Sequence, residues 1–282
     1  MTSIAVASCH GSPGVTTTVA GLAATWPGAH RPLVIEADPD GGVLAARFDE
    51  LRADRTLAEV AVEVRRRYDH ERVVASARTL WGAIPVVVAP PSAEQTHGAL
   101  AMAGEQLGEG LAGDKHPALV DVGRLTARSP ALPIARRSAL TVLVTRPTFE
   151  AVAALASRAA ELRSAGCELG LVVVGERPYP PDETAHGAGI TLLGVLPDDA
   201  RAAATLAGGA GGTRRLRRSM LWRSLADLAA RIDAVARVSQ PDGSEPDSRA
   251  EVVGSTEQPA APAADAWAGE PAGNNGSAGV QR

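Results

Sequence analysis

The stretch that decides the fold is His10-Gly-Ser-Pro-Gly-Val-Thr-Thr-Thr18, a glycine-rich loop between two apolar segments. The run Ile4–Ala7 precedes it, and an alanine-rich helical run from Thr16 to about Ala24 follows it. This order of strand, glycine loop and helix is that of a phosphate-binding P-loop. The glycines let backbone N–H groups turn toward an anion, and the helix adds its positive dipole end. The stretch therefore predicts a phosphate site, although it contains neither lysine nor arginine.

Short apolar runs recur along the chain with helical stretches between them. Six runs follow the first: Leu33–Ile35, Ile84–Val88, Ala118–Val120, Ala139–Val144, Leu171–Val174 and Thr191–Val195. They are apolar without alternation, which predicts strands buried on both faces. Helices are expected around Thr56–Arg67, Glu71–Ala77 and most clearly Phe149–Arg163, with Thr148 as N-cap. This alternation predicts an α/β fold with a doubly wound, mainly parallel sheet, whose ligand lies at the carboxyl ends of the strands.

The loop resembles the deviant Walker A loop of the ParA/MinD family of P-loop ATPases, Lys-Gly-Gly-x-Gly-Lys-Thr-Thr. Four positions match this pattern: Gly11, Gly14, Thr16 and Thr17. His10 takes the place of the family's signature lysine and Ser12 that of its second glycine. Val15 stands where the phosphate-binding lysine belongs. Both defining lysines are therefore missing.

Three later segments extend the resemblance over most of residues 1–237. The stretch Val34–Gly41 is similar to the family's Ile-Asp-x-Asp-Pro-Gln segment and puts Asp38 in the place of the catalytic aspartate. Ala118–Asp121 resembles the strand that ends in the Walker B aspartate, and Leu193–Asp198 resembles a late Leu-Gly-x-Ile-Pro strand exit. The resemblance implies a P-loop NTPase domain of the ParA/MinD type over 1–237.

The resemblance also implies a site for ATP or ADP with Mg²⁺. Its nucleotide-binding residues would be Gly11, Ser12, Pro13, Gly14, Val15, Thr16, Thr17 and Arg124, and its metal ligands Thr16 and Asp121. Each acidic or hydroxyl residue also has a plainer interpretation. Thr16 suits an ordinary helix start, and Asp38 or Asp121 could be a buried acid that caps a loop.

The missing loop lysine should lower nucleotide affinity and hydrolysis rate by amounts that can be estimated. A charge-assisted hydrogen bond contributes about 1.5–3 kcal/mol, so triphosphate binding should be roughly 10- to 150-fold weaker. Hydrolysis should lose more, since single donors to a transferring phosphoryl group contribute on the order of 10²–10³ in rate. Lys115 precedes the Asp121 strand and so lies at the wrong end of the sheet.

Two other residues could supply positive charge. Arg124 follows Asp121 by three positions and emerges at the correct strand end, as a surrogate for the lysine, as a solvated loop arginine or as an ion-pair partner of Asp121. His10 could face phosphate or a dimer partner, or be a polar loop residue without a role.

Near residue 220 an apolar stripe predicts a helix that packs on the core, with Leu221, Leu225, Leu228, Ile232 and Val235 on one face. Four arginines precede it: Arg214, Arg215, Arg217 and Arg218. At the N-terminal end of this helix the macrodipole would disfavour them, so they predict an external anion, either DNA phosphate or anionic lipid. The alternative is a solvated basic turn.

The last residues, 238–282, differ from the rest of the chain. Seven acidic residues and two arginines lie among Pro, Gly, Ser and Asn there, without apolar periodicity, which predicts a disordered acidic tail. The whole chain is 45% hydrophobic, enough for a full core in the preceding domain. Only Cys9 and Cys167 are present, and no apolar run is long enough to span a membrane, so we expect a cytoplasmic protein.

The resemblance implies a positioning or regulatory protein, serving chromosome or plasmid partition, division-site placement, or pilus or secretion-apparatus localisation. We expect weak nucleotide binding, little or no ATP hydrolysis, protein partners and a nucleotide-linked homodimer. A scaffold that binds no nucleotide is one alternative, and an active ATPase that uses Arg124 or a partner's residue is another. Nicotinamide binding is not expected, because Gly11-Ser-Pro-Gly14 lacks the three-glycine spacing.

Overall fold

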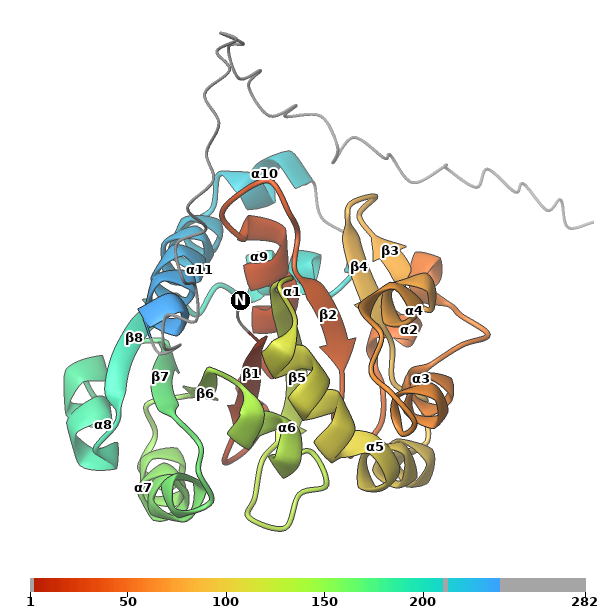
Figure 1. Ribbon diagram of the computed structural model, residues 1–282. Helices are drawn as coiled ribbons and strands as arrows, with labels where there is room; N and C mark the ends of the chain where they lie inside the picture. The colour runs from red at the N-terminus through yellow and green to blue at the C-terminus, as the bar shows by residue number, and fades with distance from the viewer. Residues whose placement is uncertain (1–2, 210–212, 239–282) are drawn as a thin grey trace, which may run out of the picture.

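The computed structural model describes residues 3–209 and 213–238 (Figure 1). Apart from Val238, the predicted acidic tail at 238–282 lies outside the described residues. Within them, no helix is both long and apolar enough to cross a lipid bilayer.

A single eight-stranded sheet forms the centre of the molecule, in the order β3-β4-β2-β5-β1-β6-β7-β8. Its strands are β1 (Ser3–Ser8), β2 (Leu33–Glu36), β3 (Arg78–Leu80), β4 (Ile84–Val87), β5 (Ala118–Arg124), β6 (Leu140–Thr145), β7 (Leu169–Val174) and β8 (Thr191–Leu196). All neighbours are parallel except β3 and β4. The seven predicted strands and the parallel sheet are confirmed. The antiparallel edge strand β3 was not predicted, because two of its three residues are exposed and it has no apolar run.

Helices cover both faces of the sheet (Figure 1). One face carries α3 (Leu57–Val64), α4 (His70–Ala75), α5 (Ala93–Gly113), α6 (Leu132–Arg137), α7 (Phe149–Ser164) and α8 (Pro181–Ala188). The other carries α1 (Val15–Thr25), α2 (Leu44–Arg47), the 3-10 turn η1 (Asp49–Leu51), α9 (Ala200–Leu206), α10 (Thr213–Arg217) and α11 (Met220–Val238). In β1, Ala5 and Ala7 pack on the first layer while Ile4 and Val6 pack on the second. The strands are therefore apolar throughout because both faces are buried.

The apolar stripe of α11 packs on the core, as predicted. Leu221, Leu225, Leu228 and Ile232 are buried, against α1 and β8. The two helices approach closely at Gly21 of α1, where an added Cβ would lie 2.5 Å from Cδ1 of Leu225. Helix α7 also begins as predicted, since the Thr148 hydroxyl accepts the N–H of Ala151 at 3.4 Å.

The prediction that the four arginines lie at the N-terminal end of the long helix is wrong. Arg214, Arg215 and Arg217 belong to the last turn of the separate helix α10, where the dipole favours cations. The two helices are divided at Ser219, whose hydroxyl accepts the N–H of Trp222 at 3.1 Å and caps α11. The position of these arginines therefore removes the argument from the dipole of the long helix for an external anion.

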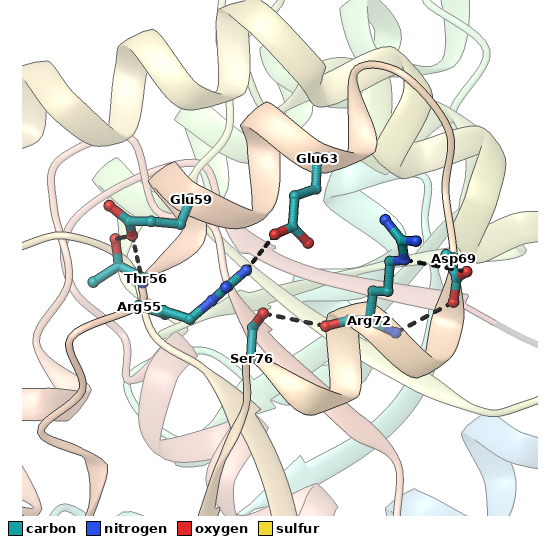
Figure 2. Close-up of polar contacts among 7 residues, drawn as sticks. All are labelled: Arg55, Thr56, Glu59, Glu63, Asp69, Arg72 and Ser76. Carbon is teal, nitrogen blue, oxygen red and sulfur yellow. Dashed lines mark hydrogen bonds and ion pairs between the residues drawn. The ribbon is translucent and has the colours of Figure 1, made fainter.

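Polar contacts fix the two short helices beside the sheet edge (Figure 2). Glu59 accepts the backbone N–H of Thr56 at 2.7 Å in a capping box at the start of α3. Asp69 accepts the N–H of Arg72 at 3.2 Å and caps α4. Both helices were predicted. Each is shorter than expected, because these caps and the following turns set its ends.

Candidate functional site

The glycine loop connects β1 to α1 and presents its backbone outward. Gly11 and Gly14 have φ of 64° and 101°, left-handed values that favour glycine, and a Cβ at either position would meet nothing within 4 Å. Gly14 is the N-cap of α1 and provides no side-chain cap for the helix. His10 and Ser12 are exposed, and Pro13 is buried beneath the loop. The open N-terminus of α1 is therefore suited to an anion.

Val15 occupies the place of the missing lysine and is only 8% exposed. It is the first residue of α1 and packs into the hydrophobic layer formed by α1, α11 and the sheet. Thr16 and Thr17, which follow it, are half-buried. The loop thus combines an accessible backbone with an apolar, inward-facing residue in the place of its expected charge.

Two buried carboxyl groups lie side by side on neighbouring strands. Glu36 ends β2 and is paired in register with Asp121 of β5. Asp121 is fully buried; its Oδ1 accepts the N–H of Gly123 at 3.0 Å, and its Oδ2 has no hydrogen-bond partner among the described residues. Burial raises the pKa of Asp121 to about 7; the nearby Glu36 and Asp38 carboxylates also raise it, while the Thr16 hydroxyl opposes the shift.

Glu36 was not among the predicted site residues, although it stands where the family segment has its first aspartate. Its Oε1 accepts the N–H groups of Val43 and Leu44 at 2.7 and 2.9 Å, and its Oε2 accepts that of Ala89 at 3.0 Å. Burial raises the pKa of Glu36, and these three hydrogen bonds oppose the shift. Glu36 therefore holds the loop after β2 against the end of β4.

Asp38 lies half-buried beside the end of β5. Its Oδ1 accepts the N–H of Asp40 at 3.0 Å, and burial raises its pKa while the charge of Arg124 lowers it. The carboxyl group rests on the backbone of Gly123, where an added Cβ would lie 2.1 Å from Cγ of Asp38. Glycine is therefore needed at position 123 for two reasons: the backbone has a left-handed φ of 59°, and a side chain would collide with Asp38.

Arg124 reaches from β5 toward the glycine loop, as predicted. Its Nη2 donates to the carbonyl of Gly11 at 3.4 Å, and its charge acts on Asp38. Among the described side chains, no ion pair joins Arg124 to Asp121. Lys115 precedes β5 and so lies at the opposite end of the strands from the glycine loop, also as predicted.

A hollow of about 120 Å³ opens beside the loop, lined by Ser12, Gly14, Thr17, Arg146, Pro197 and Asp198 among others. Arg146 follows β6 and Asp198 follows β8, so both come from the carboxyl edge of the sheet. Arg146 and Asp198 form a bidentate ion pair, with N–O distances of 2.8 and 3.1 Å. Sequence reasoning missed Arg146, because no motif marks it.

Solved structures that share this architecture include three ATPases. The cell-division ATPase MinD of Pyrococcus furiosus has a TM-score of 0.67 and 20% identity, covering 83% of this chain and 99% of its own. A ParA-family ATPase of Chlorobium tepidum has a TM-score of 0.67 and 15% identity, and the match covers 81% of this chain and 98% of the ATPase. MinD of Pyrococcus horikoshii, solved with Mg-ADP, has a TM-score of 0.66 and 18% identity, and the match covers 85% of this chain and 98% of that MinD chain.

The fold is that of the MinD and ParA ATPases. At these identities the likeness concerns the fold. Neither a protein-family model nor a curated protein sequence matches the chain. The predicted α/β architecture of the ParA/MinD type is thus confirmed.

The oxygen ligands at the carboxyl edge fit Mg²⁺. Carboxylate and hydroxyl oxygens are the donors that this hard cation prefers, and Asp121 and Thr16 provide one of each. Asp121 Oδ2 is buried and has no hydrogen-bond partner within the described part of the chain, which leaves this oxygen free to accept a cation. Thr16, at the start of α1, is close enough to Asp121 for its hydroxyl to lower the pKa of that carboxyl group, so the two residues are neighbours beside the loop.

Proposed function

We propose that this chain is a ParA/MinD-like positioning or regulatory protein that binds nucleotide weakly and hydrolyses little or no ATP. One observation carries the proposal: the loop keeps its left-handed glycines and open helix N-terminus, while a buried Val15 replaces its lysine. Partition, division-site placement and pilus or secretion-apparatus localisation are the processes proposed, in the cytoplasm.

Phosphate binding would rest on the backbone. The N–H groups at the start of α1 face an anion placed over Gly11–Thr17, and the helix dipole favours it. The family's lysine would hold the β- and γ-phosphates, so its loss leaves the inner phosphates as the main contacts. ADP is therefore expected to compete well with ATP.

Mg²⁺ would be held by Thr16 and Asp121, and it would neutralise phosphate charge when bound. Asp38 keeps the place of the family's catalytic aspartate and lies within the influence of Arg124. Val15 contributes no positive charge to a phosphoryl group leaving its nucleotide. The carboxyl groups therefore keep the arrangement of the family's site, but the lysine ammonium group that would stabilise the transferring phosphoryl group is missing.

An active ATPase remains the second candidate, because Arg124 lies beside both Asp38 and the loop. In that case its guanidinium, or a residue of a partner protein, would replace the lysine. A nucleotide-free scaffold is the remaining candidate. Protein partners and a nucleotide-linked homodimer belong to the proposal in either ATP-binding case.

Turnover of ATP distinguishes these candidates. We expect the purified protein to hydrolyse ATP no faster than the Asp38→Ala variant, because the loop provides no charge to the transferring phosphoryl group. Phosphate release in the presence of Mg²⁺ measures this. A clear wild-type rate that Arg124→Ala abolishes would contradict the proposal and support the active enzyme.

The exposed arginines of α10 and the turn after it give a separate prediction. If Arg214, Arg215, Arg217 and Arg218 bind DNA or anionic lipid, affinity should fall steeply with salt. Their combined replacement by serine should abolish binding to duplex DNA or anionic vesicles without unfolding the protein. Replacing the exposed Arg65, Arg66 and Arg67 serves as the control. Absence of binding to both ligands at low salt would contradict a binding role for these arginines.

A further inference from the structure

Two histidines and an aspartate meet near the start of the central strand β5, at the opposite end of the strands from the glycine loop. His70 is the first residue of α4, Asp114 is the C-cap that follows α5, and His116 lies two residues before β5. The other end of β5 carries Asp121 and Arg124. The cluster is therefore separate from the nucleotide site, and nothing in the proposed function uses it.

The three side chains turn ligand atoms toward one another. Nδ1 of His70 lies 2.5 Å from Oδ2 of Asp114, and Nδ1 of His116 lies 3.0 Å from Oδ1. The imidazole rings are stacked, with centroids 4.0 Å apart and planes 18° from parallel. The two ring nitrogens and the carboxylate thus offer ligand atoms that all lie within 4.8 Å of one another.

Neighbouring residues hold this arrangement in place. The Tyr68 hydroxyl donates to Asp114 Oδ2 at 2.7 Å, and the backbone N–H of His116 donates to Oδ1 at 3.0 Å. Tyr68 lies directly on α5, because Gly110 has no side chain; a Cβ there would be 2.0 Å from Cγ of Tyr68. The Asp69 cap, drawn in Figure 2, fixes the start of α4 beside His70. Such supporting hydrogen bonds orient metal ligands in proteins.

We propose that His70, Asp114 and His116 bind a transition-metal dication of the Zn²⁺ or Ni²⁺ class. Two imidazoles with one carboxylate suit these ions, whereas Mg²⁺ and Ca²⁺ prefer oxygen ligands alone. Each histidine binds the ion through the lone pair of Nδ1, so a proton held on Nδ1 moves by way of solvent to Nε2, which carries the N–H of the metal-bound imidazole. Ligands of tetrahedral zinc lie about 3.4 Å apart at bond lengths near 2.0–2.1 Å, so each ring nitrogen has to lie further from its carboxylate oxygen than the observed 2.5 and 3.0 Å, by less than about 1 Å.

Exposure of the side chains supports an open coordination position. Asp114 is 5% exposed, His70 25% and His116 41%. The carboxylate is thus fixed within the protein, while the rings have the freedom to adjust and water can reach the ion. Three protein ligands and a water complete four-coordination. Bound metal would tie α4, α5 and the entry to β5 together.

The test uses the untagged full chain, freed of metal with EDTA and then dialysed. Titration calorimetry with ZnCl₂ should show one site, and the thermal midpoint should rise with added Zn²⁺. His70→Gln and His116→Gln should each weaken binding by more than about 100-fold, and Tyr68→Phe by about 10-fold, because it removes only a supporting hydrogen bond. His97→Gln, an exposed histidine elsewhere on α5, is the matched control and should bind like wild type.

Cobalt provides a second readout that does not depend on stability. Co²⁺ bound by the wild type should give the intense visible absorption of four-coordinate sites, and one equivalent of Zn²⁺ should abolish it. MgCl₂ at the same concentration should not compete. Two results would overturn the proposal: no Zn²⁺ binding by the wild type at 0.1 mM, or equal binding by the folded His70→Gln/His116→Gln double variant.

Discussion

Val15→Lys is expected to strengthen ATP binding by about 10- to 150-fold, the equivalent of one charge-assisted hydrogen bond to phosphate. Val15 is 8% exposed at the first position of α1, so the aliphatic stem of lysine would follow its path into the apolar layer. A lysine stem can be buried while its amine reaches a polar surface, here the phosphates over the loop. ADP binding should gain less than ATP binding. Competition against a fluorescent nucleotide measures both.

Val15→Met is the matched control for this experiment, because methionine has a similar length and no charge. It should leave nucleotide affinity near the wild-type value. Equal affinities for the lysine and methionine variants would mean that position 15 does not reach the phosphates, and the loop would then differ from a P-loop in more than its missing charge.

Asp121→Asn is expected to change stability in a pH-dependent way. The native pKa of about 7 exceeds the ordinary value of 3.8, because Asp121 is fully buried and the neighbouring Glu36 and Asp38 carboxylates add to the shift. Between pH 4 and 7 the unfolded chain releases this proton while the native protein retains it, so native stability falls as pH rises. The full penalty, about 4 kcal/mol, is present above pH 7.

Asparagine removes this penalty. The free energy of unfolding of the variant, relative to that of the wild type, should therefore be higher at pH 8 than at pH 4. Urea unfolding in EDTA at the two pH values measures the difference. Asp40→Asn, at an exposed position, is the control and should show no such change. An effect of Asp121→Asn that is the same at both pH values would contradict a buried, uncompensated carboxyl group.

The sequence predicts the core strands and the main site because both follow from strong local signals. Uninterrupted apolar runs mark strands buried on two faces, and parallel strands bring their carboxyl ends to one edge, which placed Asp38, Asp121 and Arg124 beside the loop. The edge strand β3 carries no such signal, because it has solvent on one side. The break at Ser219 was missed since helical periodicity continues across it and only its hydroxyl cap divides the helices.

Other features depend on contacts between distant segments. Gly123 matters because the Asp38 side chain lies on its backbone, and Arg146 because it meets Asp198 across β7. The histidine cluster joins residues 44 positions apart, His70 and Asp114. Such pairs have no spacing that a single sequence reveals, so only the assembled fold brings them to attention.

A nucleotide titration of the wild-type protein, with and without Mg²⁺, tests the central claim most directly. The claim is that the loop has kept its phosphate-binding backbone and lost its charge. It predicts weak, saturable binding of ATP and ADP with similar dissociation constants, and stronger binding when Mg²⁺ is present. No binding of either nucleotide at millimolar concentration, by the wild type or by Val15→Lys, would show that the loop is no longer a phosphate site and that the protein acts as a scaffold.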